Sequence, residues 1–193
     1  MGEIVVTEFI SLDGVVEDPG GASGFRHGGW TFRFDRGDDG NEFKLEELRA
    51  ADAQLLGRVT YEGFAAAWPD MEHSAGEFGE KMNAMPKYVV SETLKSADWT
   101  NSTILNGDLV QDVTALKDRY DGDILVAGSG TLVRGLLANG LIDELRLMVF
   151  PIVLGSGERL FGDADDAVTL SAAGARTVGE GVVILTYRKA TAA

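Results

Sequence analysis

The sequence contains no cysteine among its 193 residues. This absence excludes disulfide bonds, thiolate metal sites and cysteine nucleophiles. Histidine is almost as scarce, with His27 and His73 as the two examples, so we expect no histidine-based metal site. Basic residues are also in the minority, because 17 lysines and arginines stand against 31 acidic residues, for a net charge of −14. Such a charge repels nucleic acid and anionic membranes at long range, so we expect neither as a partner.

Long apolar runs are missing as well. No stretch approaches the roughly 20 apolar residues that a membrane-spanning helix needs. Strand-like residues 3–10 come without a preceding signal-like segment, so we expect a cytoplasmic protein. What the sequence does have is 45% apolar residues, which is enough for a sizeable core. Its length suits one domain over residues 1–193.

The most informative stretch lies in the middle of the chain. Residues 53–56 form a short apolar run that predicts a buried strand, and Gly57 permits a tight turn before a helical periodicity from Thr60. The start of a helix leaves backbone N–H groups unpaired and carries positive potential, so this turn suits a phosphate. Arg58 adds a permanently charged, forked donor. A simple strand-turn-helix joint with a solvated arginine explains the same residues.

A second turn of this kind follows strand-like residues 123–127. Gly128, Ser129 and Gly130 precede a helix that is predicted to reach Ala138, so we expect another anion-binding turn. The match to the dinucleotide fingerprint is poor, because Val133 occupies its last glycine position. We therefore do not predict a Rossmann fold.

A long glycine-rich segment, residues 15–41, carries interspersed aromatic side chains. A loop of this length inside a compact domain is usually functional or disordered. We interpret it as a flexible lid whose Trp30 stacks on a flat ligand. The alternative is a loop that its aromatic side chains pin to the core.

The other periodicities complete a plan of alternating helices and strands. They predict helices at residues 43–51, 60–67, 74–85 and 109–119, and strands at residues 87–91, 102–105, 143–150, 168–176 and 181–188. Ser74 with Glu77 fits a capping box, and Asp108 fits an N-cap. The last two strands alternate, which favours antiparallel pairing. The predicted fold is an α/β three-layer sandwich whose mixed sheet is mainly parallel, with antiparallel C-terminal strands.

Five motifs in one order make the chain similar to a known family. They are Ser11-Leu12-Asp13-Gly14, residues 56–62 (LGRVTYE), Val89-Val90-Ser91, Ala127-Gly128-Ser129-Gly130 and residues 151–157 (PIVLGSG). With these motifs the chain resembles the dihydrofolate reductase-like superfamily. Within it, the chain looks most like stand-alone relatives of the riboflavin-biosynthesis reductase domain.

The resemblance implies NADPH as cofactor and hydride transfer to a C=N or C=O carbon of a small pterin- or pyrimidine-like substrate. The residues that it places on the cofactor are Gly57, Arg58, Thr60, Ser91, Gly128, Ser129, Gly130, Thr131, Pro151 and Gly155. Ser11, Asp13 and Trp30 would border the substrate. Asp13 is the candidate proton donor if burial raises its pKa, and a turn-stabilising residue before Gly14 otherwise.

The sequence also departs from the family pattern. Dihydrofolate reductases carry a buried acid at the start of the helix before the central strand, and Asp39 and Glu42 are the candidates here. A non-catalytic dinucleotide- or small-ligand-binding module on the same scaffold therefore stays open. The apolar run Val182–Leu185 would leave an exposed edge or face, which favours a homodimer.

Overall fold

The computed structural model describes residues 1–162 and 167–190. In chain order the elements are β1 (Glu3–Ser11), the 3-10 helix η1 (Trp30–Arg33), α1 (Gly37–Ala50), β2 (Ala51–Gly57), α2 (Arg58–Met71), α3 (Gly76–Ala84), β3 (Lys87–Val90), β4 (Ser102–Leu105), α4 (Leu109–Arg119), β5 (Asp123–Val126), α5 (Gly130–Ala138), β6 (Glu144–Phe150), β7 (Leu170–Val178) and β8 (Val182–Lys189).

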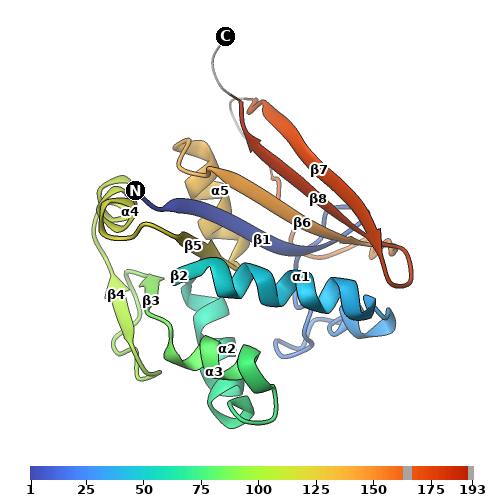
Figure 1. Cartoon of the computed structure of the whole chain (residues 1–193), viewed down its shortest axis with the longest axis horizontal. Coiled ribbons are helices and arrows are strands. Elements are labelled where there is room, and N and C mark those ends of the chain that lie inside the picture. The colour runs from blue at the N-terminus through green and yellow to red at the C-terminus, as the bar shows by residue number, and fades with distance from the viewer. Residues whose placement is uncertain (163–166, 191–193) are drawn as a thin grey trace.

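All strands of the described chain join one sheet, in the order β4-β3-β2-β5-β1-β6-β8-β7 (Figure 1). Pairing is parallel from β4 through to β6. It is antiparallel between β6 and β8 and between β8 and β7. The predicted mixed sheet, parallel in the middle and antiparallel at its C-terminal end, is confirmed.

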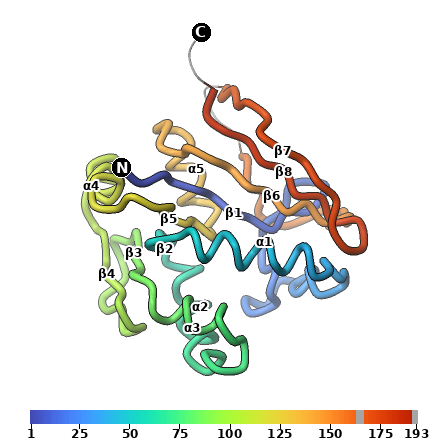
Figure 2. Tube along the Cα trace, viewed as in Figure 1, coloured from blue at the N-terminus to red at the C-terminus, as the bar shows by residue number. Residues whose placement is uncertain are grey.

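Helices cover the sheet on both faces, which gives the three layers. On one face, side chains of α1, α2 and α3 pack on β1, β2, β3 and β5, around Leu48, Tyr61, Met82, Leu56 and Leu125. On the other face, α4 and α5 pack on the same central strands, around Val113, Leu116, Leu132, Leu136 and Ile124. The C-terminal hairpin β7–β8 forms the end of the sheet farthest from β4 (Figure 2).

The helix before the central strand is longer than the sequence predicts. It begins at Gly37 and not near Phe43, so the predicted loop over residues 15–41 is shorter. Gly40 was part of that loop in the sequence interpretation, but it lies inside the helix. A Cβ atom at Gly40 would lie 3.2 Å from Val178 Cγ2 on β7, so the glycine lets the helix approach the hairpin closely.

Two further helix ends differ from the prediction. The second helix does not stop at Ala67 but continues through Trp68 and Pro69 to Met71. The third has no capping box, since it begins at Gly76 and the Ser74 hydroxyl donates to the Met71 carbonyl. Asp108, in contrast, caps its helix as predicted, because its Oδ1 accepts the Gln111 N–H at 3.0 Å.

The free edge of the sheet is not the predicted one. Residues Val182–Leu185 belong to β8, which has strand neighbours on both sides. The outer strand at the C-terminal end of the sheet is β7, whose residues 171–177 are all exposed. The apolar run that suggested an exposed edge is therefore largely interior.

The chain leaves neighbouring strands β1 and β5 toward opposite faces of the sheet. The connection after β1 leads to α1 on one face, and the connection after β5 leads to α5 on the other. Ligands of open α/β sheets bind in the crevice that forms at such a switch point, beyond the carboxyl ends of the strands. Within residues 1–162 and 167–190, no helix is long and apolar enough to cross a membrane.

Candidate active site

The two glycine-containing turns predicted from the sequence touch each other. Gly57 donates its backbone N–H to the carbonyl of Gly128 at 3.2 Å. A Cβ atom at Gly57 would overlap the Ser129 hydroxyl, so this position requires glycine. The N-termini of α2 and α5 consequently begin at one place, beside the switch point.

Neither helix has a side-chain cap at this place. Gly57 and Ser129 are the N-cap residues, no side chain accepts a hydrogen bond there, and neither first turn contains an acidic residue. The first N–H groups of both helices are therefore available as donors to an anion. These donors fit the phosphates of a dinucleotide.

One acidic side chain lies close to the turn at Gly130 and would compete with a bound anion. Glu158 Oε1 lies 3.1 Å from the position of a Cβ atom at Gly130 and accepts a hydrogen bond from Arg134 at 2.8 Å. Arg134 also donates to the Thr131 hydroxyl at 3.1 Å. A phosphate at the start of α5 would replace Glu158 as the partner of Arg134.

Arg58 and Thr60 follow Gly57 on the first turn of α2. Arg58 is exposed and pairs with Glu62 at 2.8 Å, one helical turn later. Thr60 points the other way, since its Oγ1 lies 2.7 Å from the position of a Cβ atom at Gly128. The structure thus brings Thr60 to the joint of the two turns and places Arg58 at its rim.

Ser91, expected near the adenosine, uses its hydroxyl locally. Its Oγ accepts the backbone N–H groups of Thr93 and Leu94 at 3.2 and 2.9 Å. Leu94 lines a groove of about 430 Å³ between α2 and the segment after β3, together with Tyr61 and Trp99. Ser91 therefore shapes the wall of this groove.

Asp13 is not placed as a proton donor. Its carboxylate accepts the Ser11 hydroxyl at 2.7 Å and the backbone N–H groups of Leu154 and Gly155 at 3.0 and 2.8 Å. Burial pushes its pKa up, but these hydrogen bonds outweigh burial and hold the pKa at about 2. A carboxyl group with this pKa is ionised at neutral pH, so these contacts do not support the predicted role of a catalytic acid. Its alternative, a loop-stabilising role, fits the contacts.

Ser11 and the bend after β6 belong to the same joint. Ser11 is 2% exposed, and its Oγ also accepts the Val15 N–H at 2.9 Å. Its hydroxyl is thus committed to the loop rather than presented to a substrate. Pro151 and Gly155 are exposed on the bend that Asp13 holds. Gly155 has a φ of 76°, a conformation that favours glycine.

Trp30 is buried, contrary to the expectation of a free side chain in a lid. It is 0% exposed, its Nε1–H donates to the Glu17 carbonyl at 2.9 Å, and its ring meets Phe150 edge-on at 5.4 Å. The loop is pinned to the core at this point, as the alternative interpretation held. Phe32 is 79% exposed, whereas Phe25 and Phe34 of the same segment are half-buried.

The sequence interpretation missed Glu8, which lies on β1 where the strand passes the end of β5. Glu8 is 9% exposed, and its Oε1 has no hydrogen-bond partner in the described part of the chain. This oxygen lies 3.6 Å from the position of a Cβ atom at Gly128. The available signal was a carboxyl side chain inside an otherwise apolar, β-rich run. Asp39 and Glu42, the candidates for a buried acid, are both exposed.

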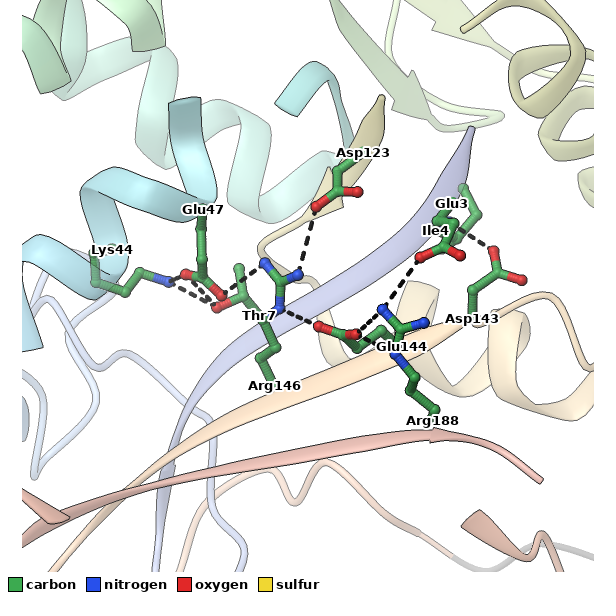
Figure 3. Close-up of polar contacts among 10 residues, drawn as sticks. All are labelled: Glu3, Ile4, Thr7, Lys44, Glu47, Asp123, Asp143, Glu144, Arg146 and Arg188. Carbon is green, nitrogen blue, oxygen red and sulfur yellow. Dashed lines mark hydrogen bonds and ion pairs between the residues drawn. The ribbon is translucent and has the colours of Figure 1, made fainter. Parts of the chain in front are cut away.

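A polar network crosses the sheet face beneath α1 (Figure 3). Lys44 pairs with the buried Glu47 at 2.6 Å and donates to the Thr7 hydroxyl at 2.7 Å. Arg146 Nη1 lies 3.6 Å from Glu47 and its guanidinium also pairs with Glu144. The network fixes Lys44 over β1, with its Nζ 5.2 Å from the ring centroid of Phe9.

In residues 1–162 and 167–190, no group of three or more histidine, aspartate or glutamate side chains is arranged to hold a metal ion. The groups that lie around the two turns are the helix N–H donors, Arg58, Arg134 and Glu8. These groups can bind an anionic cofactor and exchange a proton.

Comparison with known proteins agrees with the observed fold. A family model described as the RibD C-terminal domain matches residues 3–184. The uncharacterized protein YyaP of Bacillus subtilis (strain 168) is 30% identical over 142 residues, which cover 72% of this chain and 75% of that protein. A putative riboflavin biosynthesis protein from Shewanella sp. PV-4 has a TM-score of 0.79 at 21% identity, over 99% of this chain and 100% of that one. Dihydrofolate reductase from Enterococcus faecalis, complexed with NADP(H) and RAB-propyl, has a TM-score of 0.58 at 15% identity, over 98% of both chains.

Proposed function

The chain belongs to the RibD C-terminal domain family, and we propose that it is an NADPH-dependent reductase. It would transfer hydride to the C=N or C=O carbon of a small pterin- or pyrimidine-like substrate, such as the 5-amino-6-(5-phosphoribosylamino)uracil of riboflavin biosynthesis. The whole chain, residues 1–193, would act as one cytoplasmic reductase domain.

The contact between the two uncapped helix starts carries this proposal. Gly57 N–H meets the Gly128 carbonyl at 3.2 Å, so the first turns of α2 and α5 present their N–H groups side by side. A dinucleotide has two linked phosphates, and two adjacent donor clusters of this kind can bind both of them. Two isolated helix starts on different edges of the sheet would not support the proposal.

The remaining parts of the cofactor have a place around this contact. The groove beside Leu94 and Tyr61 is next to α2 and suits the adenosine end. Arg58, at the rim, suits an additional phosphate on the ribose. The nicotinamide end would lie toward β1 and the bend at residues 151–157. When bound, this group supplies the hydride, while the protein supplies orientation and a dry crevice.

The test measures binding and turnover separately. Thermal melting with NADPH at a hundredfold excess over its Kd should show about 2.7 kcal/mol of added stability. NADPH oxidation should then appear with dihydrofolate, with the phosphoribosylaminouracil, or with a small carbonyl compound. Absence of a melting shift with both NADPH and NADH would remove the reductase proposal.

The second candidate is a non-catalytic dinucleotide-binding module on the same scaffold. The observation that favours it is the Asp13 carboxylate, since the acid expected from the sequence is tied to the backbone of the 151–157 bend. Cofactor binding without turnover of any compound in the panel would support this candidate over the reductase.

A further inference from the structure

Glu8 is a buried carboxyl group that none of the contacts described so far uses. Three segments meet around it: β1, which carries it, the turn at Gly128, and the first turn of α2. A Cβ atom at Gly128 would lie 3.6 Å from Glu8 Oε1 and 2.7 Å from Thr60 Oγ1, so both side chains border one point. That point lies at the switch between β1 and β5, where the crevice opens.

The unpaired oxygen of Glu8 indicates a ligand contact. Glu8 is 9% exposed, and in the described residues its Oε1 accepts or donates no hydrogen bond. A buried polar atom without a partner is costly, and native structures retain few of them without a functional reason. Because this atom lies beside the turn at Gly128, 3.6 Å from the position of a Cβ atom there, a molecule bound at that turn can supply the missing partner.

Burial keeps the proton on Glu8, and two charged side chains modify its pKa. Lys44 approaches from α1 and Glu158 from the segment after β6, while the Thr60 hydroxyl of α2 does not titrate in this range. Burial raises the pKa of Glu8 to about 8, Lys44 acts in the opposite direction, and Glu158 adds to the increase. Glu8 is therefore mainly a neutral carboxylic acid at neutral pH.

Other groups near the crevice are committed elsewhere. Asp13 is ionised and holds the bend through Leu154 and Gly155. Lys44 is held by Glu47 and Thr7, at 2.6 and 2.7 Å. Of these three side chains, Glu8 is the one that combines a transferable proton, a position at the switch point and an oxygen without a hydrogen-bond partner in the described residues.

We propose that Glu8 is the proton donor of the reduction, an inference that rests on the proposed reductase function. The substrate carbon of the C=N or C=O group accepts hydride and forms a C–H bond. The π bond breaks, and its electron pair on nitrogen or oxygen takes the proton from the Glu8 carboxyl group. The substrate is reduced, the nicotinamide cofactor is oxidised, and Glu8 remains as a carboxylate that solvent reprotonates.

The decisive variant is Glu8→Gln, which keeps the shape and removes the transferable proton. We expect kcat to fall by about 10²- to 10⁴-fold, the usual contribution of a general acid. The Kd for NADPH should change by less than about threefold, because the amide still forms hydrogen bonds. Glu42→Gln is the matched control, an exposed carboxyl group on α1 that pairs with Arg49, and should leave kcat unchanged.

The pH dependence gives two further measurements. The wild-type kcat should fall as the pH rises through about 8, and the residual activity of Glu8→Gln should lack this decline. Carbon NMR of the unliganded protein, with Glu8→Gln for assignment, should give a carboxyl group that titrates near pH 8. This measurement needs no substrate, and a Glu8 pKa at the ordinary value of 4.5 would overturn the proposal.

The outcomes separate this inference from the reductase function. If wild type oxidises NADPH with dihydrofolate or the phosphoribosylaminouracil but Glu8→Gln is equally fast, Glu8 is not the donor. If Glu8→Gln loses NADPH binding in proportion to kcat, the side chain holds the cofactor and the inference is again wrong. If the wild-type protein does not oxidise NADPH with any of the substrates tested, the proposed function itself fails, and this inference fails with it.

Discussion

Oδ2 of Asp13 lies 2.8 Å from the backbone nitrogen of Gly155 and accepts its hydrogen. Oδ1 accepts the neighbouring N–H of Leu154 at 3.0 Å, so one carboxylate joins the loop after β1 to the bend after β6. These bonds are made to the charged form, which is why the pKa of Asp13 is low. The residue expected to move a proton instead holds two walls of the crevice together.

Asp13→Asn should lower the free energy of unfolding at neutral pH by about 2 kcal/mol, because a charge-assisted acceptor of two N–H groups is replaced. The folded pKa of about 2 lies below the ordinary 3.8, so the carboxylate stabilises the fold above pH 3.8. This advantage is lost as the pH falls toward 2. Urea unfolding of the wild-type protein and of Asp13→Asn measures this loss. A difference in unfolding free energy that stays constant between pH 7 and pH 2 would refute the stabilising role of the carboxylate.

Arg58→Ala should weaken NADPH binding by roughly tenfold to a hundredfold and change NADH binding much less. The reason is a charge-assisted hydrogen bond to the extra phosphate, for which Glu62 now competes at 2.8 Å. Glu62→Gln should consequently strengthen NADPH binding. Titration calorimetry with NADPH and with NADH measures the ratio of their dissociation constants in each protein. Equal losses for NADPH and NADH, or a large fall in Tm, would mean that Arg58 is structural.

Trp30→Ala should destabilise the protein by about 3–5 kcal/mol, the usual cost of removing a large buried aromatic side chain. Because Trp30 is 0% exposed, Trp30→Phe should retain the fluorescence change that NADPH produces. Chemical unfolding and fluorescence titration check the two parts. A quenching signal that disappears in Trp30→Phe would indicate that the loop opens and that Trp30 reaches the ligand.

The exposed edge strand β7 is the place where a homodimer would form. Its residues 171–177 are exposed, and an unpaired edge of this length readily pairs with a second copy. Ala173→Lys should therefore shift the protein from dimer to monomer, since charge on an edge opposes pairing. Light scattering at micromolar concentration measures the mass, and a wild-type mass of a single chain would contradict the dimer.

Lys87 should make stability rise with pH in the alkaline range. It is 0% exposed, its Nζ donates to the carbonyls of Asn83, Met85 and Thr100, and burial lowers its pKa to about 8. Between pH 8 and 10.5 the unfolded chain binds this proton more tightly, so deprotonation favours the fold. The free energy of unfolding of Lys87→Met should not rise with pH in this range. If the free energies of unfolding of wild type and variant change with pH in parallel, Lys87 is charged throughout.

Local patterns predicted most of the elements. Asp108 caps its own helix, and Gly57 ends its own strand, so neighbouring residues carry the necessary signal. The start of α1 was missed because Gly37 and Gly40 look like loop residues. Gly40 lies inside the helix at a position where Arg36, the N-cap residue of the same helix, and Val178, far along the chain, leave little room for a side chain.

The site was harder to predict because its side chains act through distant partners. Asp13 meets Gly155, 142 positions further along the chain, and Trp30 meets Phe150. Glu8 acquires its environment from the turn at Gly128 and from Glu158. A sequence pattern shows that Glu8 lies in a strand, but the partners that exclude water from it are set by the tertiary fold.

The position of β1 in the sheet has a consequence for biosynthesis. This strand pairs with residues 123–126 and 144–150, so neither neighbour exists until most of the chain has been made. At about 5–20 residues per second, the apolar side chains of β1 wait for roughly 6–28 s on the ribosome. Closure of the sheet then depends on contacts of long sequence separation, which form slowly. Nascent chains that stop before residue 144 should therefore remain bound to chaperones, with β1 as the recognised segment.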